Sequence, residues 1–141
     1  MAVTEPAAAT AAPAFLTAIK THLIGLPDQI AALEDKVYEA GLKVEVAKAN
    51  LKGCDVGMIM AIENDVDPAT GKARFGNEAK RSCELVTRRA ASTTYLAYEK
   101  GVADAELAFS KAKIELNRLV NTFSGQRHLA DLFAGYLKRS A

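Results

Sequence analysis

The chain has 141 residues, of which 50% are hydrophobic and 25% are charged, and its formal net charge is +1. This length fits one ordinary domain, and this composition excludes a chain that is disordered throughout. The near-zero net charge gives no global attraction to nucleic acid, and no apolar run approaches the ~20 residues that a membrane span requires.

The N-terminal residues 1–13 are rich in Ala, Thr and Pro, which predicts a flexible tail ahead of a single helical domain at residues 14–141. We expect a cytoplasmic protein, because this tail lacks the pattern of a secretory signal. A short amphipathic helix is predicted next, with one apolar face. That face comprises Phe15, Ile19, Leu23 and Leu26. Gly25 and Pro27 are expected to end this helix.

Residues 28–62 show an apolar pattern that alternates at spacings of three and four. The positions are Ile30, Leu33, Val37, Ala40, Val44, Ala47, Leu51, Cys54, Met58 and Ala61. A heptad pattern of this length, uninterrupted by proline, predicts a long helix with one narrow apolar stripe.

A second long helix is predicted at residues 77–123, with Asn77 as its N-cap. Its apolar stripe comprises Ala91, Tyr95, Tyr98, Val102, Ala105, Phe109, Ala112, Leu116, Leu119 and Phe123. An earlier stripe, offset by one residue, comprises Ala79, Cys83, Val86 and Ala90. The register is therefore expected to slip near residues 90–94, as at a stutter that unwinds a supercoil.

The C-terminal segment carries one further stripe, formed by Leu129, Leu132, Phe133, Tyr136 and Leu137. Whether this helix continues through Ser124 and Gly125 is left open by the sequence. Two long helices joined by a short loop are expected to pack side by side in opposite directions. The predicted fold is therefore all-α: an antiparallel two-helix coiled-coil hairpin, with a tip loop at residues 64–76 and short N-terminal and C-terminal amphipathic helices.

Such a hairpin has a thin core for its length, which favours self-association into a homo-oligomer and contact with a protein partner. The terminal stripes are expected to meet at one end of the hairpin. The predicted interface there comprises Phe15, Ile19, Leu23, Leu129, Leu132, Phe133 and Tyr136.

The loop region "NDVDPATGKARFGNEAKR" at residues 64–81 raises the question of a binding site. A calcium loop beginning at Asp65 would need Gly at Thr70 and Glu at Gly76, and a phosphate loop would need Gly at Val66. A simple turn at Asp67–Pro68, closed by Gly71, is favoured, with Val66 and residues 73–75 pairing as a small hairpin.

The same region is basic, so phosphate contact and base stacking are open to it. The candidate nucleic-acid-binding residues are Lys72, Arg74, Phe75, Lys80, Arg81, Arg88 and Arg89. The alternative is that these are solvated surface charges whose stems cover the apolar stripe.

Catalytic chemistry has little support in the sequence. Cys54 and Cys83 both fall on apolar stripes without a neighbouring base, so we expect packed thiols, with a disulfide left open in an oxidising environment. His22, His128 and Asp131 are too few to define a metal site. We therefore expect no enzyme activity, no metal and no cofactor.

Three segments, "GLPDQIAALEDKVYEA", "TGKARFGNEAKR" and "AKIELNRLVNTFSGQRHLADLFA", resemble small coiled-coil hairpin proteins encoded by tailed phages and prophages. The resemblance covers about residues 26–134. It implies an accessory role in phage DNA recombination and replication, or in countering host defences, through protein–protein contacts. Nucleic-acid binding through the basic loop is the first alternative. The second is a prefoldin-like chaperone subunit, in which apolar helix ends hold unfolded clients.

Overall fold

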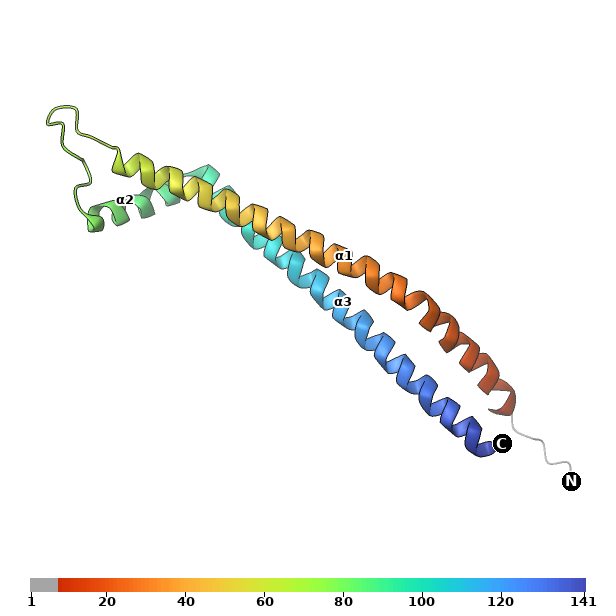
Figure 1. The fold of residues 1–141 in the computed structure, drawn as a ribbon. Helices are drawn as coiled ribbons and strands as arrows, with labels where there is room; N and C mark the ends of the chain where they lie inside the picture. Colours follow the sequence, from red (N-terminus) through yellow and green to blue (C-terminus); the bar gives the residue numbers. More distant parts are fainter. Residues whose placement is uncertain (1–7) are drawn as a thin grey trace, which may run out of the picture. The chain divides into compact units, whose positions relative to one another are not determined.

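The structure, a computed structural model, describes residues 8–141, with side chains from Ala14 onward. Three helices account for most of this range: α1 (Ala8–Glu63), α2 (Glu78–Ala91) and α3 (Thr93–Ser140) (Figure 1). Within the described range the only β pairing is an isolated antiparallel bridge between Val66 and Ala73. The all-α prediction is therefore confirmed. None of the helices described has both the length and the apolar character that crossing a bilayer demands.

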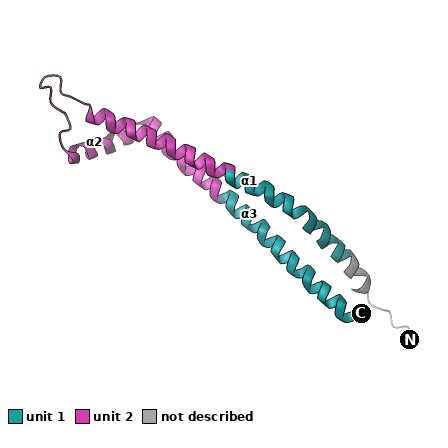
Figure 2. Ribbon diagram, in the orientation of Figure 1, with its two compact units in different colours: residues 1–38, 111–141 teal, residues 39–110 magenta. Residues whose placement is uncertain are grey.

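The chain divides into two compact units, coloured separately in Figure 2. Unit 1 comprises residues 1–38 and 111–141, and unit 2 comprises residues 39–110. The predicted tail at residues 1–13 lies partly outside the described residues, and α1 begins at Ala8.

In each unit a segment of α1 lies beside a segment of α3. In unit 1 the rings of Phe15 and Phe133 have centroids 5.2 Å apart. In unit 2 a Cβ built on Gly41 would lie 3.4 Å from the Phe109 ring. The Lys48 ammonium lies 3.0 Å from the Glu106 carboxylate. Since higher α1 numbers face lower α3 numbers in unit 2, its two segments run in opposite directions.

The prediction of a separate short N-terminal helix is wrong, because α1 continues through Gly25 and Pro27 to Glu63. Pro27 has no N–H to donate to the carbonyl of Leu23, and this weakens the helix locally. Packing in unit 1 offsets the loss, since Leu26 is 0% exposed and Ile19 is 8% exposed. The C-terminal stripe is likewise not a separate helix, because α3 continues through Ser124 and Gly125 to Ser140.

The second long helix predicted at residues 77–123 is divided at Ser92, which has φ −88° and ψ 109°. The sequence predicts a slip in register near residues 90–94 within a continuous helix, whereas the structure has a break at Ser92. The Ser92 N–H donates to the carbonyl of Arg89 at 3.3 Å, and the Ser92 Oγ accepts from the N–H of Tyr95 at 3.1 Å. Ser92 thus ends α2 and caps α3. The predicted cap at Asn77 is confirmed, because its Oδ1 accepts from the Lys80 N–H at 2.8 Å.

The less exposed positions of α1 follow the predicted spacing from Ile30 to Met58. The stripe differs at its two ends. Leu16 is half-buried whereas Phe15 is 45% exposed, and Ile62 is 2% exposed whereas Ala61 is exposed. At the C-terminal end the seam thus moves one position along the helix, to the face that meets α2.

The inward face of α2 also differs from the prediction. The predicted stripe contains Val86, which is 64% exposed, and Cys83, which is exposed. The half-buried positions are instead Arg81, Glu84, Leu85, Arg88 and Arg89. Four of these five side chains are charged, so polar contacts orient α2 and an apolar stripe does not.

Candidate functional site

The loop between α1 and α2 is held by the backbone and side chain of Asp67. Its carboxylate accepts from the N–H of Ala69 at 2.9 Å and from the hydroxyl of Thr70 at 3.1 Å. Its carbonyl accepts from the N–H of Gly71 at 2.8 Å, and Gly71 has φ 65°, which favours glycine. The Ala69 and Thr70 bonds, in that order, hold the pKa of Asp67 below its usual range. The predicted turn is therefore confirmed.

Two strand-like segments flank this turn. The Asp67 N–H donates to the carbonyl of Lys72, and the Arg74 N–H donates to the carbonyl of Asp65, both at 2.9 Å. Together with the bridge between Val66 and Ala73, these bonds form the predicted small hairpin. The hairpin brings the side chain of Arg74 back beside Asp65.

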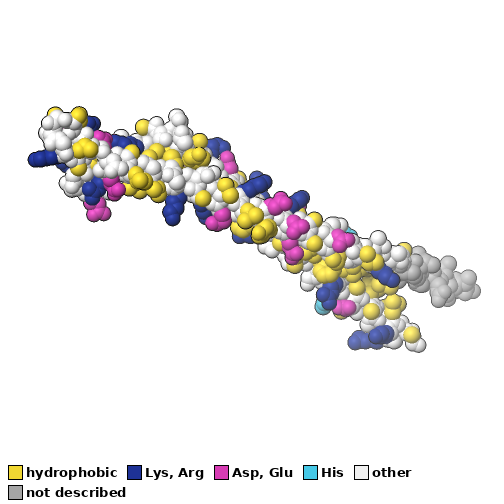
Figure 3. Space-filling view, turned by 45° about the horizontal axis from the view of Figure 1, so that its top comes forward, with side chains coloured by type: hydrophobic (Ala, Val, Ile, Leu, Met, Phe, Trp, Pro, Cys, Tyr) yellow, Lys and Arg dark blue, Asp and Glu magenta, His cyan; other side chains and the backbone are white. Residues whose placement is uncertain are grey.

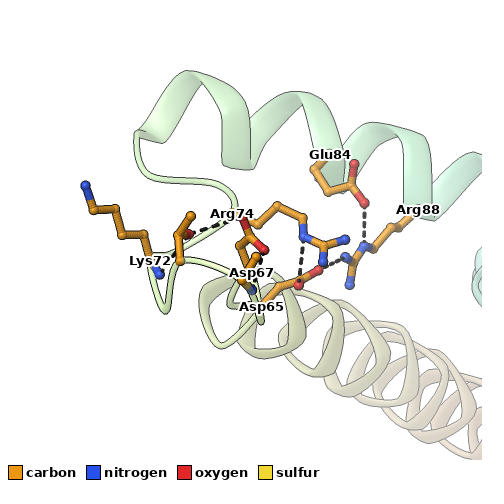
Figure 4. Close-up of polar contacts among 8 residues, drawn as sticks. Asp65, Asp67, Lys72, Arg74, Glu84 and Arg88 are labelled. Atoms are coloured by element: carbon orange, nitrogen blue, oxygen red, sulfur yellow. Dashed lines mark hydrogen bonds and ion pairs between the residues drawn. The ribbon is translucent and has the colours of Figure 1, made fainter.

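Asp65 is the centre of a cluster of charges that joins the loop to α2 (Figure 4). Its carboxylate lies 3.4 Å from Nε of Arg74 and 3.1 Å from Nη2 of Arg88. Nε of Arg88 also donates to Glu84 at 2.7 Å, and its guanidinium lies 5.8 Å from the Phe75 ring centroid. Glu84 first, and then Asp65, raise the pKa of Arg88. Both arginines therefore have carboxylate partners within unit 2.

Arg89 makes the most direct contact between α2 and α1. Its Nε and Nη2 donate to the two carboxylate oxygens of Asp55, each at 2.6 Å. The hydrogen bond to Asp55 raises the pKa of Arg89, and the guanidinium lies 5.6 Å from the Tyr95 ring centroid. A bidentate pair of this kind fixes the orientation of the guanidinium relative to the carboxylate as well as the distance between them.

We expect Asp55→Asn to lower the free energy of unfolding by about 1 kcal/mol, because it leaves the half-buried Arg89 without its carboxylate. Urea denaturation followed by far-UV circular dichroism measures this. Glu106→Gln is the matched control, because its pair with Lys48 is 52% and 51% exposed and is expected to contribute little. Equal stability of the two variants would contradict the docking role of Arg89.

The remaining candidate nucleic-acid-binding residues are dispersed. Nη1 of Arg81 donates to the carbonyl of Phe75 at 3.5 Å, and Phe75 is half-buried. Lys80 is exposed, and Lys72 extends away from the charged cluster (Figure 4). The structure therefore brings together Arg74, Phe75 and Arg88, but it does so around Asp65.

The excess of basic residues in this part of the sequence does not reveal their acidic partners. Asp55 and Asp65 belong to α1 and the start of the loop, and the basic residues follow them in the chain. The sequence does contain a sign of these pairs, because two carboxylates near the end of one helix are followed by a basic stretch at the start of the next helix. When the chain folds back on itself, these carboxylates and basic residues become neighbours.

The predicted interface residues of unit 1 fall into two groups. Ile19 is 8% exposed, Leu23 and Phe133 are half-buried, and Phe15 contacts Phe133, so these residues serve the packing of unit 1. Three others are exposed, and we call them the terminal patch. They are Leu129 at 46%, Leu132 at 59% and Tyr136 at 67%. Hydrophobic side chains are visible on the surface in Figure 3.

Few groups in the described part of the chain offer reactive chemistry. Cys54 is half-buried and Cys83 is exposed, and neither is in a disulfide, so the expectation of a packed thiol is wrong for Cys83. The reason is that α2 is turned by its arginine pairs. Among residues whose positions are described, no three His, Cys, Asp or Glu side chains form a group that could hold a metal ion.

Comparisons with protein-family models, with curated proteins and with solved structures give no match for this chain.

Proposed function

We propose that this chain is a non-enzymatic interaction protein of the cytoplasm that self-associates and binds a protein partner through exposed apolar side chains. The balance of burial carries this proposal. Among the described residues the buried hydrophobic ones are Ile19, Leu26, Val44 and Ile62. In contrast, nineteen large hydrophobic side chains are exposed. Among them Leu129, Leu132 and Tyr136 share one face of α3, and exposed apolar patches are typical of interaction sites.

The finer architecture that we propose is an antiparallel coiled-coil hairpin. The opposed directions of α1 and α3 in unit 2 support it, as do the three-and-four spacings of the half-buried positions. Within unit 1 the terminal patch then remains as a surface for an amphipathic helix of a partner, because Leu129, Leu132 and Tyr136 share one face of α3 at spacings of three and four.

The resemblance to phage-encoded hairpin proteins supports an accessory role in phage DNA metabolism or in counter-defence. Nucleic-acid binding has weaker support, since Arg74, Arg88 and Arg89 already have carboxylate partners. A chaperone role of the prefoldin type draws on the same terminal patch. This chaperone role would be favoured if the wild type suppresses aggregation of an unfolded client and a variant with a substituted terminal patch does not.

Self-association predicts that sedimentation equilibrium at micromolar concentration gives a mass of at least two chains. A mass of 15.0 kDa throughout the concentration range would contradict the proposal.

Partner binding is tested by affinity capture with the Leu132→Glu, Tyr136→Glu double variant. We expect this variant to lose a partner that the wild type retains, because charge in a dry apolar contact is costly. Leu107→Glu is the matched control, since Leu107 is 56% exposed and lies in unit 2. Loss of the partner in both variants, or in neither, counts against the terminal patch. Salt-titrated DNA binding by the wild type would instead favour the nucleic-acid alternative.

A further inference from the structure

In unit 2, α1 carries a second apolar stripe, separate from the one that faces α3. We call it the outer stripe, and it comprises Leu42, Val46, Ala49, Gly53, Val56 and Met60. The spacings alternate between four and three, which is a heptad pattern of its own. All six residues are exposed, and the four larger ones are 49%, 61%, 44% and 55% exposed in chain order.

The outer stripe lies on the side of α1 that faces away from α3. At 3.6 residues per turn, its mean direction is about 160° from that of the inward stripe containing Val44 and Leu51. The contacts of α1 with α2 in unit 2 are made through other positions, such as Asp55. A Cβ added to Gly53 would meet no atom within 4 Å. Within unit 2, therefore, no described element covers the middle of the outer stripe.

The glycine at position 53 needs an explanation, because a helix with Gly53 is about 1 kcal/mol less favourable than one with alanine. The sizes of the side chains are arranged symmetrically about Leu51. Leu42 and Met60 are equally far from it, as are Val46 and Val56, and as are Ala49 and Gly53. Large side chains thus lie at both ends of the stripe, and the smallest lie in its centre.

We propose that the outer stripe is a self-association surface, which pairs with the same stripe of a second copy in the antiparallel direction. The proposal rests on the self-association proposed above and assigns it a surface. In an antiparallel pair each layer combines the two different heptad positions. Leu42 then meets Met60 of the second copy, Val46 meets Val56, and Ala49 meets Gly53. Every layer has a partner of suitable size, and the small central residues let the two helices approach closely.

Two-fold symmetry makes a second copy a better occupant than an unrelated helix. An isologous contact requires one surface that is complementary to itself, and the symmetric order of sizes about Leu51 provides this. The outer stripe contains no charged residue, so pairing it with its own copy buries no charge among the six positions. Antiparallel pairing also sets the helix dipoles in opposite directions. Covering the stripe on both copies removes roughly 1000 Å² from water, which is near the lower limit for a specific interface.

The first test is sedimentation equilibrium of Val46→Glu. We expect its dimer dissociation constant to rise roughly 100-fold or more, because each dimer would bury two unpaired carboxylates against valine. Val86→Glu is the matched control, since Val86 is 64% exposed and lies on α2 in the same unit. It should dimerise like the wild type. Far-UV circular dichroism of both variants checks that the helices are retained, as expected for side chains that are 61% and 64% exposed.

The second test determines direction, and it does not depend on weakening the dimer. In a Cys54→Ser, Cys83→Ser background, Val46→Cys and Val56→Cys variants are prepared separately and mixed. A short bismaleimide should link the mixture into dimers and should link neither variant alone. Linking of either variant alone would overturn the antiparallel register.

The outcomes separate this inference from the proposed function. A wild type that is monomeric at every concentration overturns both. If the wild type forms an oligomer that Val46→Glu leaves intact, the outer stripe is not the interface, and self-association uses another surface. If no homodimer forms and Val46→Glu disrupts a complex with another protein, the stripe binds a helix of that protein and the inference of self-pairing is overturned.

Discussion

Leu26→Ala is expected to lower the free energy of unfolding by about 3 kcal/mol, the largest effect that we expect from truncation of a side chain to alanine in unit 1. Leu26 is 0% exposed and is the largest fully buried side chain among the described residues. Its loss removes apolar contacts and leaves a cavity between α1 and α3. The neighbouring Pro27 adds to the effect, because the helix at this point has one backbone hydrogen bond fewer and depends on packing.

Urea denaturation at a fixed protein concentration measures this effect, with far-UV circular dichroism as the signal. Ile24→Ala is the matched control, because Ile24 lies two residues earlier in the same helix and is 70% exposed. It should change the unfolding free energy by less than about 0.5 kcal/mol. If both variants lost the same stability, Leu26 would not be the buried anchor that the structure shows.

Ile62→Ala is expected to have a similar cost in unit 2, about 3 kcal/mol. Ile62 is 2% exposed and occupies the last turn of α1, where the helix meets α2. Removing three carbon atoms here weakens the apolar support of α2 beside Leu85, and it leaves the arginine pairs to hold that helix. In the Ile62→Ala variant we therefore also expect the backbone amides of α2 to exchange hydrogen faster than those of α3 in unit 1.

Ile59→Ala, in the preceding turn, provides the comparison, because Ile59 is 36% exposed. Its expected cost is about 1 kcal/mol. A cost for Ile59→Ala as large as that for Ile62→Ala would show that the inward face of α1 is turned toward Ile59 from where the structure places it.

These two positions also show where sequence periodicity is accurate and where it is not. The spacing of Phe15, Ile19, Leu23 and Leu26 predicts an apolar face that includes Leu26, and the structure buries Leu26. The heptad pattern of residues 28–62 is off by one residue at Ala61, since Ile62 is the buried position. The predicted stripe matches the less exposed positions of α1 from Ile30 to Met58, and it is off by one residue where α1 meets α2.

Local chemistry alone determined several features of this protein. The cap at Asn77 and the turn closed by Gly71 depend on groups within four residues of one another. Their free energies arise from bonds that neighbouring residues make whatever the rest of the chain does. The sequence therefore predicts them well, whereas it shows the break at Ser92 only as a slip in the apolar register.

Tertiary structure alone decided the continuity of α1 through Pro27, the face that α2 turns toward α1 and the state of the basic residues. Burial of Leu26 outweighs a missing hydrogen bond, and Asp55 pairs with an arginine 34 residues away. Each result is a competition between a local preference and contacts with distant residues. The sequence contains both the local preference and the residues that make the distant contact. Only folding brings those residues together, so the stronger of the two interactions cannot be identified from the sequence alone.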